Sequence, residues 1–391
     1  MKIVAVGIGQ CGCNIADEFY GINNYSKSFL NRRIEILTEA FAVNTDETDL
    51  GGLRHIPKDK RHRIMIGTMT TFGHGVGKIN TDAAKIAKAH HPVVIDSILQ
   101  SKKFHESDGI VVIASGGGGT GSGAIGWVVK GLKERIEKPV YAMVVLPFAY
   151  EENGGAFHAV TNTATCLKTV NQYADAVFLL DNERFGRMGT SLAADLKEIN
   201  HKMAESFYDI FCAGEEKKQK YVGSKVVDAG DIKQSLEGVS AIGRGEISLS
   251  TFYRLRKDQF REGVKEAFSV AGALGQAVNN LSLGLKIEDA RKILLLLCAP
   301  KDVISLSVLE ECSTFLREKS PESAIRIGDY PRRGTQTSVT LVVSKLTKVT
   351  RMEDLYLRAE ESFEKQKVID IEAERKIEQL HEASKRLPVL A

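Results

Sequence analysis

Short apolar runs rich in Val and Ile alternate with longer segments of mixed polarity through the first half of the chain. The apolar runs lie at Lys2–Val6, Ala40–Val43, Ile110–Ala114, Val140–Leu146 and Ala176–Leu180. The mixed segments include Thr81–Gln100 and Ala156–Tyr173, which are long enough for helices. Continuous apolar strands that alternate with helices are typical of a parallel sheet covered on both faces. The pattern therefore predicts an α/β, Rossmann-like first domain.

A long amphipathic helix is predicted after this domain. From Ser191 to Phe211, apolar residues recur every three or four positions and define one stripe over about six helical turns. The stripe consists of Leu192, Leu196, Ile199, Met203, Phe207 and Ile210. We expect this helix to connect the first domain to a second unit. The polar segment Gly214–Lys220 that follows predicts a loop.

The second unit mixes helices and strands, which predicts an α+β domain. A helical pattern covers Phe252–Leu281, and strands are predicted at Lys292–Cys298, Ala324–Gly328 and Ser338–Ser344. From Arg351 to Arg386 charges dominate and apolar residues recur at helical intervals, which predicts an amphipathic helix lying on the surface or on a partner. The predicted organisation is a first domain at 1–189, a connecting helix at 190–213, a second domain at 214–350, and a C-terminal helix and tail at 351–391.

Composition and charge narrow the class of protein. A chain of 391 residues exceeds what one core usually holds, which agrees with two domains. The net charge is +3, with basic and acidic residues interspersed, so nucleic acid is not indicated as a partner. The start MKIVAVGIG predicts a strand rather than a signal peptide, and no apolar run approaches the ~20 residues of a membrane span. Six scattered cysteines without zinc spacing favour reduced thiols in a cytoplasmic protein.

Two glycine-rich turns each follow a predicted strand. GIGQCGCN (Gly7–Asn14) follows the first strand, and SGGGGTGSG (Ser115–Gly123) leads from a strand into a segment of helical periodicity. Such a loop exposes backbone N–H groups at the positive end of a helix dipole, and glycine lets the backbone approach a phosphate without a Cβ clash. A turn with positive φ accounts for one or two glycines but poorly for six. Phosphate binding is therefore the favoured interpretation.

The phosphate ligand is narrowed by what surrounds these loops. GIGQCG fits G-x-G-x-x-G, but the acidic residue expected about 20 positions later in a dinucleotide fold is missing, and Asp46 is the first candidate. A P-loop is excluded, because the only Gly-Lys pair, Gly77-Lys78, is followed by Ile79 instead of Ser or Thr. A third glycine cluster, FGHGVGK (Phe72–Lys78), adds donors. Three loops at one end of a sheet favour a nucleotide with several phosphates.

Several motifs resemble those of the tubulin/FtsZ superfamily, in the same order along most of the chain. GGGTGSG (Gly117–Gly123) resembles the superfamily's signature loop, and GQCG (Gly9–Gly12) resembles the first nucleotide loop of tubulin. NTD (Asn44–Asp46) and LPFAYE (Leu146–Glu151) are similar to FtsZ segments, whereas DNE (Asp181–Glu183) resembles tubulin's base-reading loop. The mixture most resembles the archaeal CetZ group.

The resemblance implies a site for GTP or GDP, with Mg²⁺ held mainly by the nucleotide phosphates. Contacts to phosphates and nucleoside are implied for Gly9, Gln10, Cys11, Gly12, Cys13, Asn14, Asn44, Gly75, Val76, Gly77, Gly117, Gly118, Gly119, Thr120, Gly121 and Ser122. Glu151 would accept from the ribose hydroxyls, and Asn182 and Asn200 would bind the guanine edge, since a carboxamide both donates and accepts. Leu196 stands where the family places an aromatic ring against the base, which leaves the stacking partner open.

Two acidic residues after the long helix are the candidates for hydrolysis. VVDAGDIKQSL (Val226–Leu236) resembles the FtsZ segment N-x-D-x-x-D, which in that family completes the site of the next subunit. Asp228 and Asp231 would share one face of an opening helical turn and polarise a water for attack on the γ-phosphate. Their spacing alone favours ordinary helix capping. The resemblance favours catalysis, with Asp231 foremost.

The function implied by the resemblance is that of a cytoskeletal GTPase. Head-to-tail stacking would bring the acids of one subunit to the phosphates of the next, and a heterologous contact that does not close yields filaments. Hydrolysis would then depend on assembly, the main partner would be the chain itself, and control of cell shape is the implied role. A non-polymerising nucleotide-binding regulator remains an alternative, as does, with less support, an NAD-dependent Rossmann oxidoreductase.

Overall fold

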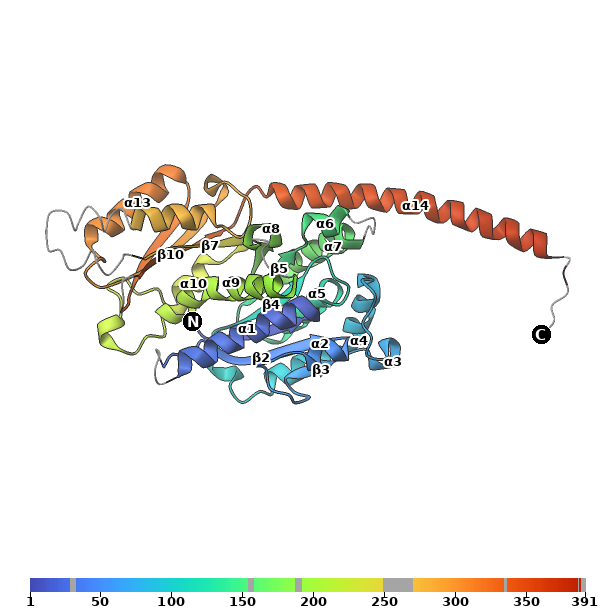
Figure 1. Ribbon diagram of the computed structural model, residues 1–391, viewed down its shortest axis with the longest axis horizontal. Coiled ribbons are helices and arrows are strands. Elements are labelled where there is room, and N and C mark those ends of the chain that lie inside the picture. Colours follow the sequence, from blue (N-terminus) through green and yellow to red (C-terminus); the bar gives the residue numbers. More distant parts are fainter. Residues whose placement is uncertain are drawn as a thin grey trace.

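The described part of the chain folds around one sheet of ten strands (Figure 1). The computed structural model describes residues 1–28, 33–153, 158–186, 192–248, 270–333, 336–385 and 387. In their order across the sheet, the strands are β3 (Arg63–Met65), β2 (Leu37–Asn44), β1 (Ile3–Ile8), β4 (Gly109–Ser115), β5 (Val140–Leu146), β6 (Ala176–Asp181), β7 (Gly238–Ser248), β10 (Gln336–Ser344), β8 (Lys292–Ala299) and β9 (Ala324–Pro331). The predicted α/β class is confirmed.

The first six strands form the parallel sheet that the apolar runs predict. Each pairs in parallel with its neighbours, in the order 3-2-1-4-5-6 of doubly wound nucleotide-binding folds. Their carboxyl ends therefore meet at one edge, the carboxyl edge, where Ile8, Asn44, Ser115, Leu146 and Asp181 end their strands. The opposite side is the amino edge. Only the three-residue β3 escaped prediction, because it is too short to carry a pattern.

Helices cover both faces of this parallel sheet. The elements of the first half are α1 (Gly9–Lys27), α2 (Glu47–Gly51), α3 (Thr68–Thr71), α4 (Asn80–Leu99), η1 (Phe104–Glu106), α5 (Thr120–Arg135), α6 (Ala149–Asn153), α7 (His158–Tyr173), α8 (Asn182–Phe185) and α9 (Leu192–Ala213). The side chains of β1 alternate between two cores: Val4 and Val6 pack with α4, α5 and α7, and Ile3 and Ala5 pack with α1 and α9. This alternation follows from the two-residue period of a strand.

The helix α9 confirms the predicted long connection, with one correction. Ile199, Met203, Phe207 and Ile210 are buried as the stripe predicts, but Leu196 is 38% exposed. The reason is that α9 starts at the carboxyl edge, where the first turns extend past the core. Its 22 residues span about 33 Å, enough to carry the chain to the amino edge.

Contacts at the far end of α9 confirm that it reaches the amino edge. There the ammonium group of Met1 donates to the Phe211 carbonyl (2.9 Å) and pairs with Glu215 (3.0 Å). Since Met1 precedes β1, α9 ends beside the start of the central strand. The chain therefore leaves α9 on the side of the sheet opposite the glycine loops (Figure 1).

The second half extends the same sheet. Its helical elements are η2 (Gln219–Tyr221), α10 (Ala229–Ser235), the helical residues 270–279, η3 (Ile287–Asp289), α13 (Leu306–Lys319) and α14 (Thr350–Ser384). The three predicted strands are confirmed as β8, β9 and β10. Of the predicted helix Phe252–Leu281, residues 252–269 lie outside the described ranges. The predicted loop Gly214–Lys220 is irregular until η2 begins.

The strand β7 joins the two halves and was not predicted from the sequence. It pairs in parallel with β6 and antiparallel with β10. Its glycines hide the strand pattern, yet they have a packing role: a Cβ on Gly243 would lie 2.1 Å from the Ala277 carbonyl oxygen, and one on Gly245 2.0 Å from that of Ala273. The helical segment 270–279 therefore packs directly on the β7 backbone.

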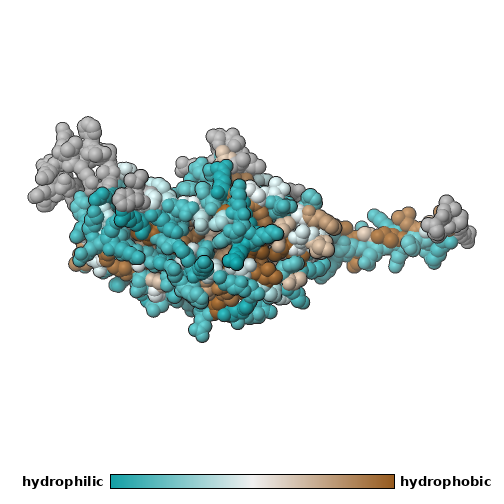
Figure 2. Space-filling view, turned by 90° about the horizontal axis from the view of Figure 1, so that it is seen from below, coloured by the Kyte–Doolittle hydropathy of each residue, from teal (hydrophilic) through white to brown (hydrophobic). Residues whose placement is uncertain are grey.

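The C-terminal helix α14 is fixed only at its root. Leu355 and Ala359 are buried, and Arg351 and Arg358 pair with Glu152, whose side chain is 3% exposed. Residues 363–385 are exposed, and the helix projects beyond the body (Figures 1 and 2). Of the two predicted placements, packing on the chain's own surface is wrong beyond these first turns, and packing on a partner stays a prediction. None of the helices in the described ranges combines the length and apolar character that a membrane span requires.

Candidate nucleotide-binding site

Three glycine-rich segments meet at the carboxyl edge, as predicted. The first loop touches the second: a Cβ on Gly9, whose φ is +70°, would lie 2.9 Å from the Gly121 nitrogen. The second loop touches the third: a Cβ on Gly119 would lie 2.7 Å from a Val76 methyl and 2.9 Å from the Lys78 Cα. The loops therefore form one continuous backbone surface at the start of α5.

A buried asparagine on α7 holds the second and third loops together. The side-chain nitrogen of Asn162 donates to the carbonyls of Lys78 (2.8 Å) and Gly118 (3.1 Å). Ser122 Oγ donates to the Gly119 carbonyl (3.2 Å) from the first turn of α5. These hydrogen bonds satisfy loop carbonyl groups with partners from the protein itself. Sequence reasoning missed Asn162, since a polar residue within a helix gives no sign of which loop it will contact.

The six glycines of the second loop have two different explanations. None of them has a positive φ. Cβ atoms would lie within 2.2 to 3.0 Å of other protein atoms at five of the positions, which are Gly116, Gly117, Gly119, Gly121 and Gly123. A Cβ on Gly118 would meet nothing within 4 Å. Close packing by itself accounts for five of the six glycines, and Gly118 is left as the glycine that faces open space.

A polar network connects the first two loops through Asp49 on α2. Its carboxylate accepts from Gln10 Nε2 and from Asn44 Nδ2, both at 2.9 Å. The hydroxyls of Thr45 and Thr120 share a 2.7 Å hydrogen bond. Burial raises the pKa of the Asp49 carboxyl, and Asp46 adds to the rise, against the hydrogen bond from Asn44. Asp49 was not among the predicted residues, although its spacing from Asp46, which caps α2, signals a helix start.

Two residues predicted to contact the ligand are buried under the site instead. The Cys13 thiol is fully buried and donates to the carbonyls of Gly7 (3.4 Å) and Val43 (3.5 Å). Asn44 is 1% exposed, and both ends of its amide are used, toward Asp49 and the Thr45 nitrogen. Cys13 lies in the core between β1 and β2, so its predicted contact is wrong. Asn44 supports the loop from beneath.

The residues predicted for the nucleoside also gather at the carboxyl edge. Burial raises the pKa of the Cys11 thiol to about 12, and the charge of Glu151 adds to the rise. Glu151 lies in α6 and accepts from the Phe148 nitrogen (2.9 Å). Asn182 begins α8 and Asn200 lies on α9, both half-buried. Gln10 and Asn14 are exposed one turn apart on α1.

The elements that carry these residues are joined by short contacts. Glu183, next to Asn182, accepts from the Ala149 nitrogen at the start of α6 (2.8 Å). Where α8 ends, a Cβ on Gly186 would lie 3.7 Å from Ile199, the neighbour of Asn200. The structure thus brings α1, α6, α8 and α9 to one place, where the sequence supplied only separate motifs.

The two acids predicted for hydrolysis lie far from these loops, at the start of α10. Asp228 caps the helix and accepts from the Asp231 nitrogen (2.8 Å), while Asp231 accepts from the Asp228 nitrogen (3.4 Å). Asp231 also forms an ion pair with Arg326 of β9, which sequence reasoning missed. In Figure 1, α10 lies beside the N-terminus, at the amino edge. The capping role is therefore present, and the expected separation of loops and acids is confirmed.

Comparison with known proteins decides the family. Residues 2–190 match the GTPase domain of the Tubulin/FtsZ family, and residues 189–361 match the C-terminal domain of tubulin-like CetZ proteins. The tubulin-like protein CetZ1 of Haloferax volcanii is 30% identical over 371 residues, which cover 91% of each chain. The chain belongs to the tubulin-like CetZ family. The predicted tubulin/FtsZ superfamily, CetZ group and GTPase class are confirmed. The alternative of an NAD-dependent oxidoreductase is excluded.

Solved CetZ structures have the same architecture. The GDP-bound monomer of Haloferax volcanii CetZ1 is 28% identical, covers 93% of this chain and 99% of its own, and gives a TM-score of 0.78. The GTPγS-bound protofilament of CetZ2 from the same organism is 26% identical, covers 94% and 100%, and gives 0.80. The likeness extends over both halves of the chain, including the sheet that joins them.

Proposed function

We propose that the chain binds GTP at the carboxyl edge, assembles head to tail, and hydrolyses GTP where the acids of one subunit meet the phosphates on the next. The observation that carries this proposal is the separation of the two parts, glycine loops at one edge and the α10 acids at the other. A subunit arranged in this way cannot bring both to one nucleotide by itself. The CetZ relatives whose structures carry GDP or GTPγS support the choice of guanine nucleotide.

The phosphates are assigned to the backbone around Gly118 and to the first N–H groups of α5. These N–H groups lack helical partners and lie at the positive end of the dipole of a 16-residue helix. The third loop, from Gly75 to Gly77, adds backbone N–H groups beside them. Mg²⁺ would be held mainly by the phosphates.

The guanine is assigned to the carboxamides of Asn182 and Asn200. Leu196 lies one helical turn before Asn200 on α9 and is exposed, so both side chains leave the same face of the helix. We assign to Leu196 the apolar contact with the base that an aromatic ring makes in other superfamily members. Glu151, on α6, is assigned the ribose hydroxyls.

For hydrolysis, the two acids differ in availability. Asp228 is exposed, whereas Asp231 is half-buried and forms an ion pair with Arg326. Although the resemblance ranks Asp231 first, Asp228 is therefore assigned the water that attacks the γ-phosphate, and Asp231 the orientation of Asp228 through their reciprocal cap. The cellular role assigned to the filament is control of cell shape in the cytoplasm.

The test is the dependence of hydrolysis on protein concentration. Phosphate release per molecule should be negligible in dilute solution and should rise together with light scattering as filaments form. Asp228→Asn and Gly118→Val should each be inactive alone, because one lacks the acid and the other the phosphate site. Mixed together they should recover partial activity, since some interfaces pair an intact acid with an intact pocket. A rate per molecule that is flat with concentration would rule out the shared site.

A further inference from the structure

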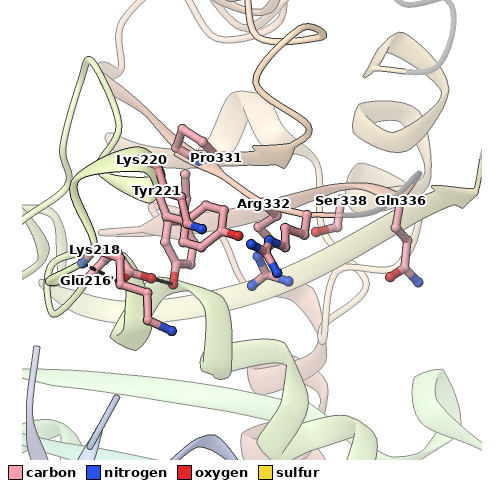
Figure 3. Close-up of a pocket in the computed structure, with 10 residues that line it drawn as sticks. Glu216, Lys218, Lys220, Tyr221, Pro331, Arg332, Gln336 and Ser338 are labelled. Carbon is pink, nitrogen blue, oxygen red and sulfur yellow. Dashed lines mark hydrogen bonds between the residues drawn. The ribbon is translucent and has the colours of Figure 1, made fainter. Parts of the chain in front are cut away.

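A cavity of about 370 Å³ lies in the second half of the molecule (Figure 3). One wall is the segment 216–221, which includes η2, and the other is formed by the end of β9 and the start of β10. Figure 3 shows the side chains of Lys220, Tyr221 and Arg332 turned toward the same space. The volume is that of a small-molecule site.

The lining of this cavity is strongly basic. Lys218, Lys220, Arg332 and Arg333 line it, against the single carboxylate of Glu216. That carboxylate already accepts from the Lys218 nitrogen (2.8 Å) and from the Tyr330 hydroxyl (3.1 Å). Among the described residues, Lys220 and Arg333 have no ion-pair partner. Since Arg332 is paired with Asp209 beneath it, the excess of positive charge at the cavity comes from Lys220 and Arg333.

The cations are held in place by side chains beneath them. Arg332 forms an ion pair with Asp209, which is 1% exposed, and its guanidinium lies 5.1 Å from the Tyr330 ring centre. Lys220 and Arg333 lie 5.0 and 6.0 Å from the centre of the Tyr221 ring. A ring contact orients a cation without neutralising it. Lys220 and Arg333 are therefore positioned by Tyr221 and keep their charge.

We propose that this cavity binds a small polyanion that carries two or more phosphate or carboxylate groups. Arginine forks and lysine ammonium groups bind such groups through charge-assisted hydrogen bonds. Binding also relieves the repulsion among the gathered cations. The tyrosine rings add planar surface on which the body of the ligand packs.

The cavity is connected to the acids at α10. The segment that follows residue 221 in the cavity wall is hydrogen-bonded to β9. There the Asp329 carboxylate accepts from the backbone nitrogens of Ser224 (3.0 Å) and Lys225 (2.6 Å). Arg326, on the same strand, pairs with Asp231. A bound anion would therefore steady the segment that presents Asp228 and Asp231. This regulatory consequence rests on the proposed function, whereas anion binding does not.

The experiment is calorimetric titration of the full chain with inorganic triphosphate, in excess GDP so that the carboxyl edge is filled. We expect saturable binding, weakened about tenfold by either Lys220→Gln or Arg333→Gln, the effect of losing one charge-assisted hydrogen bond. The matched control is Lys217→Gln, which removes the same charge from an exposed lysine outside the cavity and should bind normally. Citrate in place of triphosphate distinguishes carboxylate from phosphate ligands.

Equal binding by Lys217→Gln, Lys220→Gln and Arg333→Gln would overturn the proposal, because the signal would then come from general surface charge. An absence of binding to the unaltered chain by both anions would overturn it as well. Assembly and GTP hydrolysis are measured separately on the same samples. An unaltered chain that assembles and hydrolyses GTP normally but binds neither anion would contradict this site and leave the proposed function intact.

Discussion

At the scale of single residues, neighbouring positions of the same type have different roles. Gly118 and Gly119 are adjacent in the second loop, yet one faces open space and the other fits against Val76 and Lys78. Asp228 and Asp231 cap the same helix, yet only Asp231 is paired with Arg326. A motif therefore identifies the segment, and contacts decide what each position contributes.

Substitution with alanine can distinguish the roles of the two glycines. Gly118→Ala should leave the unfolding temperature unchanged but weaken GTP binding, because its Cβ enters only the space assigned to the phosphates. Gly119→Ala should lower both, at a cost of about 1–3 kcal/mol in folding free energy from overpacking. Titration with fluorescent GTP and thermal unfolding of both variants provide the comparison. Normal GTP affinity in Gly118→Ala would show that the loop only packs.

At the scale of elements, helix ends carry much of the site. The start of α5 faces the assigned phosphates, α8 begins with Asn182, and α10 begins with the reciprocal cap of Asp228 and Asp231. Such ends have unpaired backbone N–H groups that need partners. An acid at the start of α10 therefore has a structural role whether or not it also acts on water.

Substitutions at Asp228 can distinguish these two roles. Asparagine caps a helix about as well as aspartate, so Asp228→Asn should retain stability, whereas Asp228→Ala should lose about 1 kcal/mol. If Asp228 activates water, both variants should lose most hydrolysis and form filaments that persist. The measurements are chemical denaturation, phosphate release and the lifetime of light scattering. Full GTPase activity in Asp228→Asn would mean that Asp228 only caps α10 and does not act on water.

At the scale of the whole molecule, one sheet connects two ends with different chemistry. Pairing of β6 with β7 joins the halves, and α9 runs from the carboxyl edge to the amino edge. The root of α14 is clamped to Glu152, beside the Glu151 assigned to the ribose. Beyond residue 362 the helix is exposed to its last described residues (Figure 2).

Truncation tests how separate the distal helix is. A chain that ends at Ser362 should unfold at the same temperature as the full chain and bind GTP equally, since the removed residues that the structure describes are exposed. In contrast, Arg358→Ala should lower the unfolding temperature, because the buried Glu152 loses one of its two cations. Thermal unfolding with and without GTP compares the two changes. A large loss of stability on truncation would mean that the helix packs on the body.

The sequence by itself determined the elements whose signal is local. Apolar runs located the strands of the parallel sheet except the short β3, helical spacing located α9 and α14, and the ordered motifs indicated the superfamily. It failed where the deciding partner is distant in the chain. Whether a glycine packs or faces a ligand, whether Cys13 points to the site or the core, and which residue holds Asp231 depend on contacts between remote segments. β7 was hidden for the same reason, because its glycines serve a helix packed against it.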